Sequence, residues 1–417
     1  MNRTRTLILA DDLTGANDTA IQFRKYGLSA LVVTHINRAG TAIFGDYDVI
    51  AINSDSRRMC PNDAYRVIFD AVKAFEIAGN GFYVYKKVDS VLRGNPGQEL
   101  AAMMDALHIP LALAAPAFPA NRSILKHGRL PSGVDAVRIF TDGSRRKTAN
   151  IPLETIRQGA PSVVAFIHSR NSQGTQVFVA DAVNDTDMET IYAASTCLGK
   201  PHILTGSAGL ANQLARNPGK EKELIKENPV VLSPMPALVV AGSRQVETAV
   251  QIVTLSQSFA IPIIRFKVSL VMKGKSDEAI REAQTEAMER MRHNMPVCII
   301  AVESMFYTET AGNINQQYTE RDEMGKAISE ALGILTGKLF DDFRFSLLVS
   351  TGGDTSMGVC HHLGISGMEP LKEIYPGIPL TRIVGGVYDE RFMITKSGRF
   401  GEPDTLLTIF KSLGIHQ

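Results

Sequence analysis

Cysteine is scarce in this sequence, and the spacing of its few cysteines excludes two classes of stabilised site. Cys60, Cys197, Cys298 and Cys360 lie far apart, and no two of them form a CxxC pair. This spacing argues against both a zinc site and a disulfide framework. We therefore expect reduced, buried thiols.

Net charge and long apolar runs are also lacking. The 44 basic and 43 acidic side chains leave a net charge of +1, so no overall field would gather nucleic acid or an anionic membrane. No run approaches the roughly 18 apolar residues of a membrane span. Near the N-terminus only four apolar residues in a row precede Asp11 and Asp12, too few for a signal peptide. We expect a cytoplasmic protein without nucleic-acid or membrane partners.

Two common nucleotide motifs are missing, and one candidate metal pair fails. No GxGxxG follows a predicted strand, which removes the specific argument for NAD. The segment Gly333–Lys338 looks like part of a P-loop, but its spacing is wrong, Ser or Thr does not follow the lysine, and the pattern around it is helical. His361 and His362 are consecutive, so on a helix they diverge by about 100°. The metal ligands are left unassigned.

What the sequence does contain is two stretches of alternating βα pattern. A chain of 417 residues favours two domains of roughly 200 residues each. Short apolar runs alternate with amphipathic helical stretches in both halves, which is typical of parallel sheets. A charged, proline-containing segment, Asn217–Pro236, indicates a linker. The predicted fold is therefore two α/β domains, 1–228 and 229–417, each with a largely parallel sheet flanked by helices.

The expected elements follow from these runs. Strands are expected at Thr6–Ala10, Ala30–Thr34, Val49–Asn53, Phe82–Lys87, Leu111–Ala115, Val163–Ile167, His202–Thr205, Ala237–Ala241, Pro262–Phe266, Val297–Val302, Ser346–Ser350, Thr381–Val384 and Phe392–Thr395. Helices are expected to begin near Leu13, Pro61, Pro96 and Ala208, and to cover Glu247–Ser258, Asp277–Arg292 and Glu320–Asp341.

Polar segments follow several predicted strands in the first half, at the edge where open α/β sheets bind ligands. Asp11 and Asp12 end the first strand, and one of them could meet a substrate while the other caps a helix. Ser56 and Arg57 could clamp a carboxylate with charge-assisted hydrogen bonds, although a solvated arginine fits equally well. His127, in a proline-containing loop, is more typical of a surface histidine than of a catalyst.

The densest polar segment is YKKVDSVLRGNPG, at Tyr85–Gly97. Lys87 and Arg93 suit an acid substrate or a transferring phosphate. Asp89 could hold a sugar hydroxyl or accept its proton. An exposed βα loop is the alternative interpretation.

Glycine loops follow three predicted strands in the second half. The strongest, STGGDTSMGV, opens a helix whose first N–H groups would face an anion. The candidate ligand-binding residues of the three loops include Ser243, Gly352, Gly353, Gly398 and Gly401. Each loop alone is a common turn, but three in one domain suit a nucleotide.

In combination these motifs resemble the four-carbon acid sugar kinases, a family that includes D-threonate, D-erythronate and 3-oxo-tetronate kinases. The resemblance spans almost the whole chain through ADDLTGAND, DSR, KKVDSVLRGN, APAFPAN, GS, TGGDTS and KSGRFG, in that order. It implies an acid-binding N-terminal domain, an ATP-binding C-terminal domain and a reaction in the cleft between them. Two departures bear on substrate preference and on the last nucleotide loop: Val91 stands where the family often has Thr, and Arg399 where it often has a third glycine.

The resemblance implies Mg²⁺- and ATP-dependent phosphorylation of the terminal hydroxyl of a tetronate, with D-threonate ahead of D-erythronate and 3-oxo-tetronate. By motif, the acid would contact Asp11, Asp12, Arg57, Lys87, Val88, Asp89, Ser90 and Arg93. ATP would contact Ser243, Gly352, Gly353, Asp354, Thr355, Gly398 and Gly401. The candidate catalytic residues are Asp12, Lys87, Asp89 and Asp354, and the motifs do not choose a base among the aspartates.

Two rival interpretations stay open from the sequence. One is a sugar-acid dehydrogenase or isomerase with a nucleotide-type cofactor. The other is a sensor that binds ligand without consuming ATP. The oligomeric state is left open by the sequence, and a homo-oligomer is one expectation.

Overall fold

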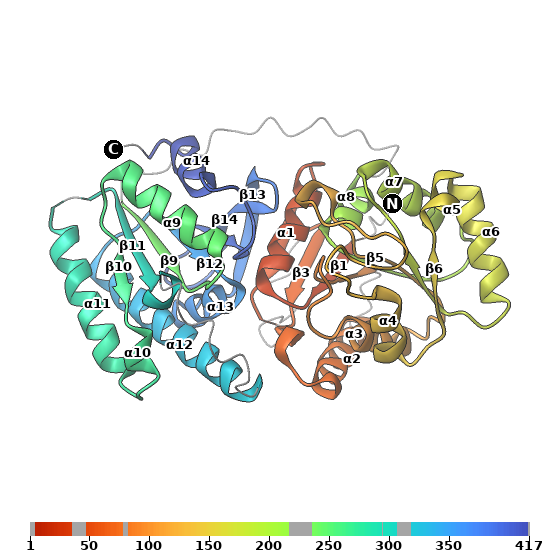
Figure 1. Ribbon diagram of the computed structural model, residues 1–417, viewed down its shortest axis with the longest axis horizontal. Helices are drawn as coiled ribbons and strands as arrows, with labels where there is room; N and C mark the ends of the chain where they lie inside the picture. Colours follow the sequence, from red (N-terminus) through yellow and green to blue (C-terminus); the bar gives the residue numbers. More distant parts are fainter. Residues whose placement is uncertain are drawn as a thin grey trace. The chain divides into compact units, whose positions relative to one another are not determined.

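The structure, a computed structural model, describes residues 5–35, 47–77, 82–216, 236–293, 295–306 and 318–415. The chain divides into two compact units, Met1–Lys226 and Glu227–Gln417, and both are α/β (Figure 1). The predicted fold class is confirmed. The predicted boundary at residue 228 falls within residues 217–235, which lie outside the described ones.

The N-terminal unit contains a parallel sheet of strand order β2-β3-β1-β4-β8-β5-β7-β6. Its strands are β1 (Thr6–Ala10), β2 (Ala30–Val33), β3 (Val49–Asn53), β4 (Tyr83–Lys87), β5 (Ala112–Ala115), β6 (Thr148–Ile151), β7 (Val177–Ala180) and β8 (Ile203–Gly206). β1 and β3 are buried almost throughout, because helices cover both faces of the sheet.

Two groups of helices cover this sheet (Figure 1). One group comprises α1 (Leu13–Arg24), α5 (Leu153–Arg157), α6 (Ala160–Asn171), α7 (Asp185–Thr196) and α8 (Ala208–Ala215). The other comprises α2 (Pro61–Ile77), α3 (Pro96–Ala106) and α4 (Ala136–Ser144). α3 and α4 approach so closely that a Cβ on Gly97 would lie 2.8 Å from the Cα of Gly143.

The C-terminal unit has the strand order β10-β11-β9-β12-β15-β14-β13. The pairs from β10 to β15 are parallel, and β14 is antiparallel to both β15 and β13. The strands are β9 (Ala237–Ala241), β10 (Ile264–Phe266), β11 (Val297–Val302), β12 (Leu347–Thr351), β13 (Gly367–Tyr375), β14 (Ile378–Val384) and β15 (Phe392–Lys396).

Helices also lie on both faces of the second sheet (Figure 1). α9 (Val246–Phe259) packs with α14 (Thr405–Ser412). The other group is α10 (Val268–Val271), α11 (Ser276–Met291), α12 (Tyr318–Asp342) and α13 (Gly353–His362). The P-loop-like segment Gly333–Lys338 lies inside α12, as its helical pattern predicts.

Several expectations need correction. The expected strand Val163–Ile167 lies in α6, where Val163 and Ile167 are buried one turn apart on the same helix face. β6, β7 and β13 were not expected. Cys60 and Cys197 are exposed rather than buried, whereas Cys298 and Cys360 are buried. No helix in the described ranges is long and apolar enough to cross a membrane.

Candidate active site

Three neighbouring strands of the N-terminal unit end at one edge of its sheet. Ala10 at the end of β1 is paired with Asn53 of β3 and with Lys87 of β4. The polar segments that follow these strands therefore lie together, as their positions after strands predict. We call Asp11, Asp12, Arg57, Lys87, Asp89 and Arg93 the strand-end cluster.

Arg57 joins two of the carboxylates in this cluster. Its Nε and Nη2 donate to Asp11 at 2.7 and 3.0 Å, and its Nη1 donates to Asp12 at 2.5 Å. Asp12 is also the N-cap of α1, because its Oδ1 accepts from Gly15 N at 2.8 Å. Of the two adjacent aspartates it is therefore Asp12 that caps the helix, while Asp11 contacts only the guanidinium in this cluster.

Asp89 is held by a second arginine. Arg93 donates to it from Nε and from Nη2, both at 2.8 Å, and Arg57 Nη2 lies 3.9 Å from its Oδ1. The turn after Asp89 places Leu92 at φ 60° and Gly94 at φ 84°. A Cβ on Gly94 would lie 3.2 Å from the Cα of Arg57, so this turn packs directly against the Arg57 backbone.

Lys87 differs from the other cations of the strand-end cluster. Its side chain is 4% exposed, and within the described residues its ammonium has no hydrogen bond or ion pair. A Cβ on Gly15 would lie 3.0 Å from Lys87 Nζ, which places the ammonium beside the first turn of α1. A buried donor without a protein partner is costly, so Lys87 is the group most available to an incoming anion.

Lys86, the preceding residue, has a structural role instead. It is fully buried, and its ammonium lies 2.7 Å from Glu99 Oε2 on α3 and 3.1 Å from the carbonyl oxygen of Leu9. The other Glu99 oxygen accepts from Ser56 Oγ at 2.6 Å. This buried pair therefore fixes the short turn that carries Arg57.

The two central carboxylates are strongly biased toward the ionised form. Burial opposes ionisation of Asp12, but Arg57 and Lys87 outweigh it and lower the pKa of this carboxyl. Burial also opposes ionisation of Asp89, yet the hydrogen bonds from Arg93 and the charge of Arg57 hold its pKa well below the usual range. Carboxylates of this kind accept hydrogen bonds well but are weak bases.

The contacts of Val88 and Ser90 do not indicate a role in binding the acid. The Val88 side chain is buried, and its N–H donates to Gly206 O at 2.9 Å. Ser90 is half-buried, and its carbonyl accepts from Ser123 Oγ at 2.8 Å. Neither contact leads toward the strand-end cluster, so their predicted role as acid-binding residues stays a prediction.

Two further residues position the turn of Arg57: Glu99, which the sequence analysis missed, and Asn95, which belongs to the polar segment Tyr85–Gly97 but was given no role. Asn95 Nδ2 donates to the carbonyl oxygens of Ser56 and Met59 at 3.1 and 2.9 Å. Asn95 is the N-cap of α3 and Glu99 lies in its first turn. In the sequence, two polar residues four positions apart at the start of an otherwise apolar helix could have indicated their role.

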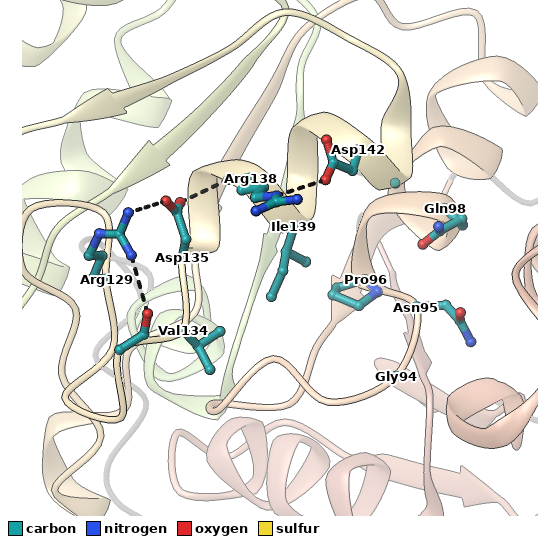
Figure 2. Close-up of a pocket in the computed structure, with 12 residues that line it drawn as sticks. Gly94, Asn95, Pro96, Gln98, Arg129, Val134, Asp135, Arg138, Ile139 and Asp142 are labelled. Carbon is teal, nitrogen blue, oxygen red and sulfur yellow. Dashed lines mark hydrogen bonds and ion pairs between the residues drawn. The ribbon is translucent and has the colours of Figure 1, made fainter. Parts of the chain in front are cut away.

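A pocket of about 530 Å³ lies beside the turn at Gly94 and Asn95 (Figure 2). Figure 2 shows its charged wall, in which Arg129 pairs with Asp135 at 2.6 Å and Arg138 with Asp142 at 3.3 Å. Each arginine is thus matched by a carboxylate of the same wall. Unlike the strand-end cluster with Lys87, this pocket has no cation without an ion-pair partner among the described residues that line it.

In the C-terminal unit the three glycine loops meet at Ser243. A Cβ on Gly398 would overlap with Ser243 Oγ, and one on Gly242 would overlap with Thr355 Oγ1. Gly352, at φ 97°, lies against both Ser243 and Thr355 and forms the N-cap of α13. The predicted loops are therefore brought together around one hydroxyl.

Two further observations concern these loops. Gly401 has φ 90°, and a Cβ there would overlap with the buried hydroxyl of Thr405, which has no hydrogen bond in the described structure. α13 begins at Gly353, so the N–H groups of its first turn have no partner within the helix. Asp354 lies in that turn. The backbone here suits an anion.

Replacing Gly398 by alanine tests how tightly the loops pack. We expect Gly398→Ala to lower the free energy of unfolding of the C-terminal unit by about 1–3 kcal/mol, because the new methyl group overlaps with Ser243 Oγ. Adding Ser243→Ala should recover part of this loss. Urea unfolding measures both. Gly337→Ala in α12, where a Cβ meets nothing within 4 Å, is the control and should not destabilise; equal losses in both alanine variants would contradict the packing.

Among the described residues, no group of three or more His, Cys, Asp or Glu side chains could hold a metal ion by itself. Asp354 is the carboxylate in the first turn of α13, next to Gly352 and Gly353. Mg²⁺ is commonly held by one or two carboxylates together with substrate phosphates. A metal at these loops would therefore depend on the nucleotide.

Comparison with known proteins assigns a different kind of ligand to each of the two units. The model of a sugar-binding N-terminal domain matches residues 6–138 and 127–214, and that of a nucleotide-binding C-terminal domain matches 238–406. A D-threonate kinase of Salmonella typhimurium is 27% identical, with 96% of each chain covered. A 3-oxo-tetronate kinase of Pseudomonas savastanoi is 29% identical, with 99% of each chain covered. The chain belongs to the four-carbon acid sugar kinase family. Its predicted class, a phosphotransferase with an alcohol group as acceptor, is confirmed.

Solved structures support the fold of this four-carbon acid sugar kinase. A Salmonella typhimurium protein superposes with a TM-score of 0.76 at 22% identity, covering 97% of this chain and 98% of its own. A Haemophilus influenzae protein gives 0.66 at 21% identity, covering 98% and 100%. Within the kinase, the strand-end cluster lies in the range of the sugar-binding model, and the glycine loops lie in that of the nucleotide-binding model.

Proposed function

We propose that this kinase uses ATP with Mg²⁺ to phosphorylate the terminal hydroxyl of a four-carbon sugar acid. D-Threonate is the first candidate, followed by D-erythronate and 3-oxo-tetronate. The observation that carries the proposal is Lys87, a buried ammonium without a protein partner among the described residues, at the strand-end edge of a sugar-binding domain. The names of the relatives support the choice of acids.

Hydrogen-bond capacity in the cluster, rather than net charge, supports the binding of an anion there. Its three cations and three carboxylates balance, with Arg57 paired to Asp11 and Asp12 and Arg93 paired to Asp89. Lys87 is the cation of the cluster that forms no hydrogen bond or ion pair among the described residues. Arg57 uses three of its five N–H groups on the two aspartates, so two remain for the carboxylate of the acid. We assign the acid's carboxylate to Arg57, and its reacting end to the neighbourhood of Lys87.

Phosphoryl transfer of this kind depends mainly on positioning and on charge neutralisation. Asp12 and Asp89 have lowered pKa values, so they suit orienting the hydroxyl by accepting its hydrogen bond. Lys87 would offset the negative charge that develops on the transferring group. In a loose transition state the hydroxyl loses its proton late, so a weak base suffices.

The second domain would present the nucleotide. Ser243, Gly352, Gly353, Thr355, Gly398 and Gly401 would hold ATP through the glycine loops, and Asp354 would serve as metal-side ligand or as an alternative base. Mg²⁺, when bound, supplies charge neutralisation on the phosphates. That the reaction takes place in a cleft between the two domains stays a prediction.

A screen for ADP release tests the proposed reaction. The protein is mixed with MgATP and, separately, with D-threonate, D-erythronate, L-threonate and 3-oxo-tetronate. We expect ADP release to depend on one of the two D-acids or on the 3-oxo acid. Lys87→Met protein measures the background ATPase activity.

Two outcomes would contradict it. Thermal stabilisation by an acid and by ATP without ADP release would identify a sensor. Stabilisation by NAD but not by ATP would favour a dehydrogenase, since only a ligand that binds the folded state stabilises it by mass action.

A further inference from the structure

A third buried lysine, after Lys86 and Lys87, lies next to the glycine loops of the C-terminal unit. Lys396 is the last residue of β15, and its side chain is fully buried. Its ammonium donates to Ser397 O at 2.9 Å and to Phe400 O at 3.0 Å, and within the described residues it forms no ion pair. Burying an ammonium without a carboxylate partner costs several kcal/mol. A buried ammonium that destabilises the fold in this way indicates a functional role for Lys396.

The loop that Lys396 holds has its carbonyl groups turned inward. Thr248 Oγ1 donates to Gly398 O at 2.8 Å, and Gln251 Nε2 donates to Phe400 O at 3.0 Å. The described chain has no cis peptide bond, and in a trans peptide the C=O and N–H groups point in opposite directions. The N–H groups that follow these carbonyls therefore point away from the interior.

Those N–H groups belong to Gly398, Arg399 and Gly401. None of these three backbone N–H groups donates a hydrogen bond to another described residue, whereas the Arg399 side chain donates from Nε to Gln245 Oε1 at 3.1 Å. The N–H groups of Gly398 and Arg399 are consecutive, and that of Gly401 follows after Phe400, whose N–H donates to Ser397 O at 3.1 Å. Neighbouring outward N–H groups can form an anion-binding concavity. Gly398 lies beside Ser243, and Gly401 beside the unpartnered buried hydroxyl of Thr405. Outward N–H donors on this loop indicate a ligand rich in oxygen atoms.

Lys396 also connects this loop to the second glycine loop. Its carbonyl oxygen accepts from Gly352 N at 2.9 Å, next to the N-terminus of α13. In the sheet, its Cα is paired with that of Thr351. One residue thus contacts both loops, one through its backbone and the other through its ammonium.

We propose that Lys396 is a positioning residue for nucleotide binding: its ammonium holds the carbonyl groups of Ser397 and Phe400 inward, so that the N–H groups of Gly398, Arg399 and Gly401 face the phosphates of ATP. This inference rests on the proposed use of ATP by the C-terminal unit. Lys396 does not touch the nucleotide in this arrangement. Its charge matters, because charge-assisted hydrogen bonds are roughly twice as strong as neutral ones.

If the charge of Lys396 is needed for nucleotide binding, the affinity for nucleotide should depend on pH. A purely structural role of the side chain would not produce this dependence. Burial lowers the pKa of the Lys396 ammonium to about 7. The negative charge of Glu247 on α9 opposes this shift but is the smaller of the two effects. The carbonyl groups of Ser397 and Phe400 and the side chains of Thr248 and Gln251 around the loop do not titrate. Nucleotide affinity should therefore fall as the pH rises through 7.

Calorimetric titration with MgATP, without any acid present, tests the proposal. Lys396→Met should bind MgATP about 10- to 100-fold more weakly than the wild type at pH 6.5, the range that a charged hydrogen bond accounts for. Binding of the sugar acid should be unchanged. Lys411→Met, which removes an exposed lysine of α14 in the same unit, is the matched control and should bind like the wild type.

A pH series on the wild type gives a second measurement that needs no variant. Between pH 7 and 9 the dissociation constant for MgATP should rise by up to about tenfold per pH unit, and in a folded Lys396→Met variant this dependence should vanish. A flat wild-type profile, or equal affinities of the variant and the wild type at pH 6.5, would overturn the role of Lys396. If the wild type did not bind MgATP at any pH, the proposed function would be overturned as well. This outcome can be told apart from failure of the Lys396 role, because it is seen in the wild type without any substitution.

Discussion

Lys87→Met is expected to lower kcat by about 10²- to 10³-fold, the usual cost of removing one group that stabilises transition-state charge. The methionine keeps the length and the apolar part of the side chain but removes the ammonium. The change breaks no hydrogen bond or ion pair to the described protein, but it removes a charge that helps to lower the pKa of Asp12 and Asp89. Burying the ammonium is itself costly, so the two effects oppose each other, and we expect the free energy of unfolding to change by about 1 kcal/mol or less. Steady-state kinetics and a thermal melt measure the two effects.

The split between kcat and KM decides which role Lys87 has. If Lys87 offsets charge on the transferring phosphoryl group, kcat falls while KM for the acid changes little. A raised KM for the acid with unchanged kcat would contradict this role and move Lys87 to the acid's carboxylate. A kcat within tenfold of the wild type, with unchanged KM, would remove Lys87 from the site altogether.

Arg57 provides a contrast with Lys87. Its guanidinium is engaged by Asp11 and Asp12, so Arg57→Ala would remove the partner of two buried carboxylates as well as any contact with the acid. Breaking a buried pair on one side costs about 3–5 kcal/mol. Loss of activity in that variant would therefore not separate binding from folding, and Lys87 is the cleaner test.

The edge of the first sheet could be predicted from the sequence because each polar segment directly follows an apolar run. Strand ends, and the helix starts at Leu13 and Pro96, were predictable from local signals. The alternation of side chains along a strand also distinguishes Lys86 from Lys87, since neighbours in β4 point to opposite faces. Local pattern therefore finds the segments that carry the chemistry.

Contacts between distant segments could not be predicted in the same way. Arg57 lies 46 positions from Asp11, and no local signal indicates that the two pair. The short apolar run at Val163–Ile167 has the composition of a strand, and only packing shows that it is helical. β13, with half-exposed polar positions, lacks the continuous apolar character of the strands that were found.

The second large effect is expected at Lys86. Lys86→Met should lower the free energy of unfolding of the N-terminal unit by about 3–5 kcal/mol, because it leaves the carboxylate of Glu99 buried without its counter-charge. Urea unfolding measures the loss. Adding Glu99→Leu removes the buried carboxylate and should recover most of the lost stability, although Ser56 then loses its hydrogen bond to Glu99 and keeps the one it shares with Ser54.

The stability of the Lys86→Met variant should depend on pH, because Glu99 then lacks its counter-charge. Burial, with Asp11 adding to it, already raises the pKa of Glu99 in the wild type even against the charge of Lys86, and without Lys86 the pKa rises further. Glu99 is then protonated in the folded state at pH values where it is ionised in the unfolded chain, so stability is lost as the pH rises above about 4.5. Lys86→Met should therefore be closer to the wild type at pH 5 than at pH 8. A loss of less than about 1 kcal/mol at pH 8 would show that the pair does not hold the turn of Arg57 in place.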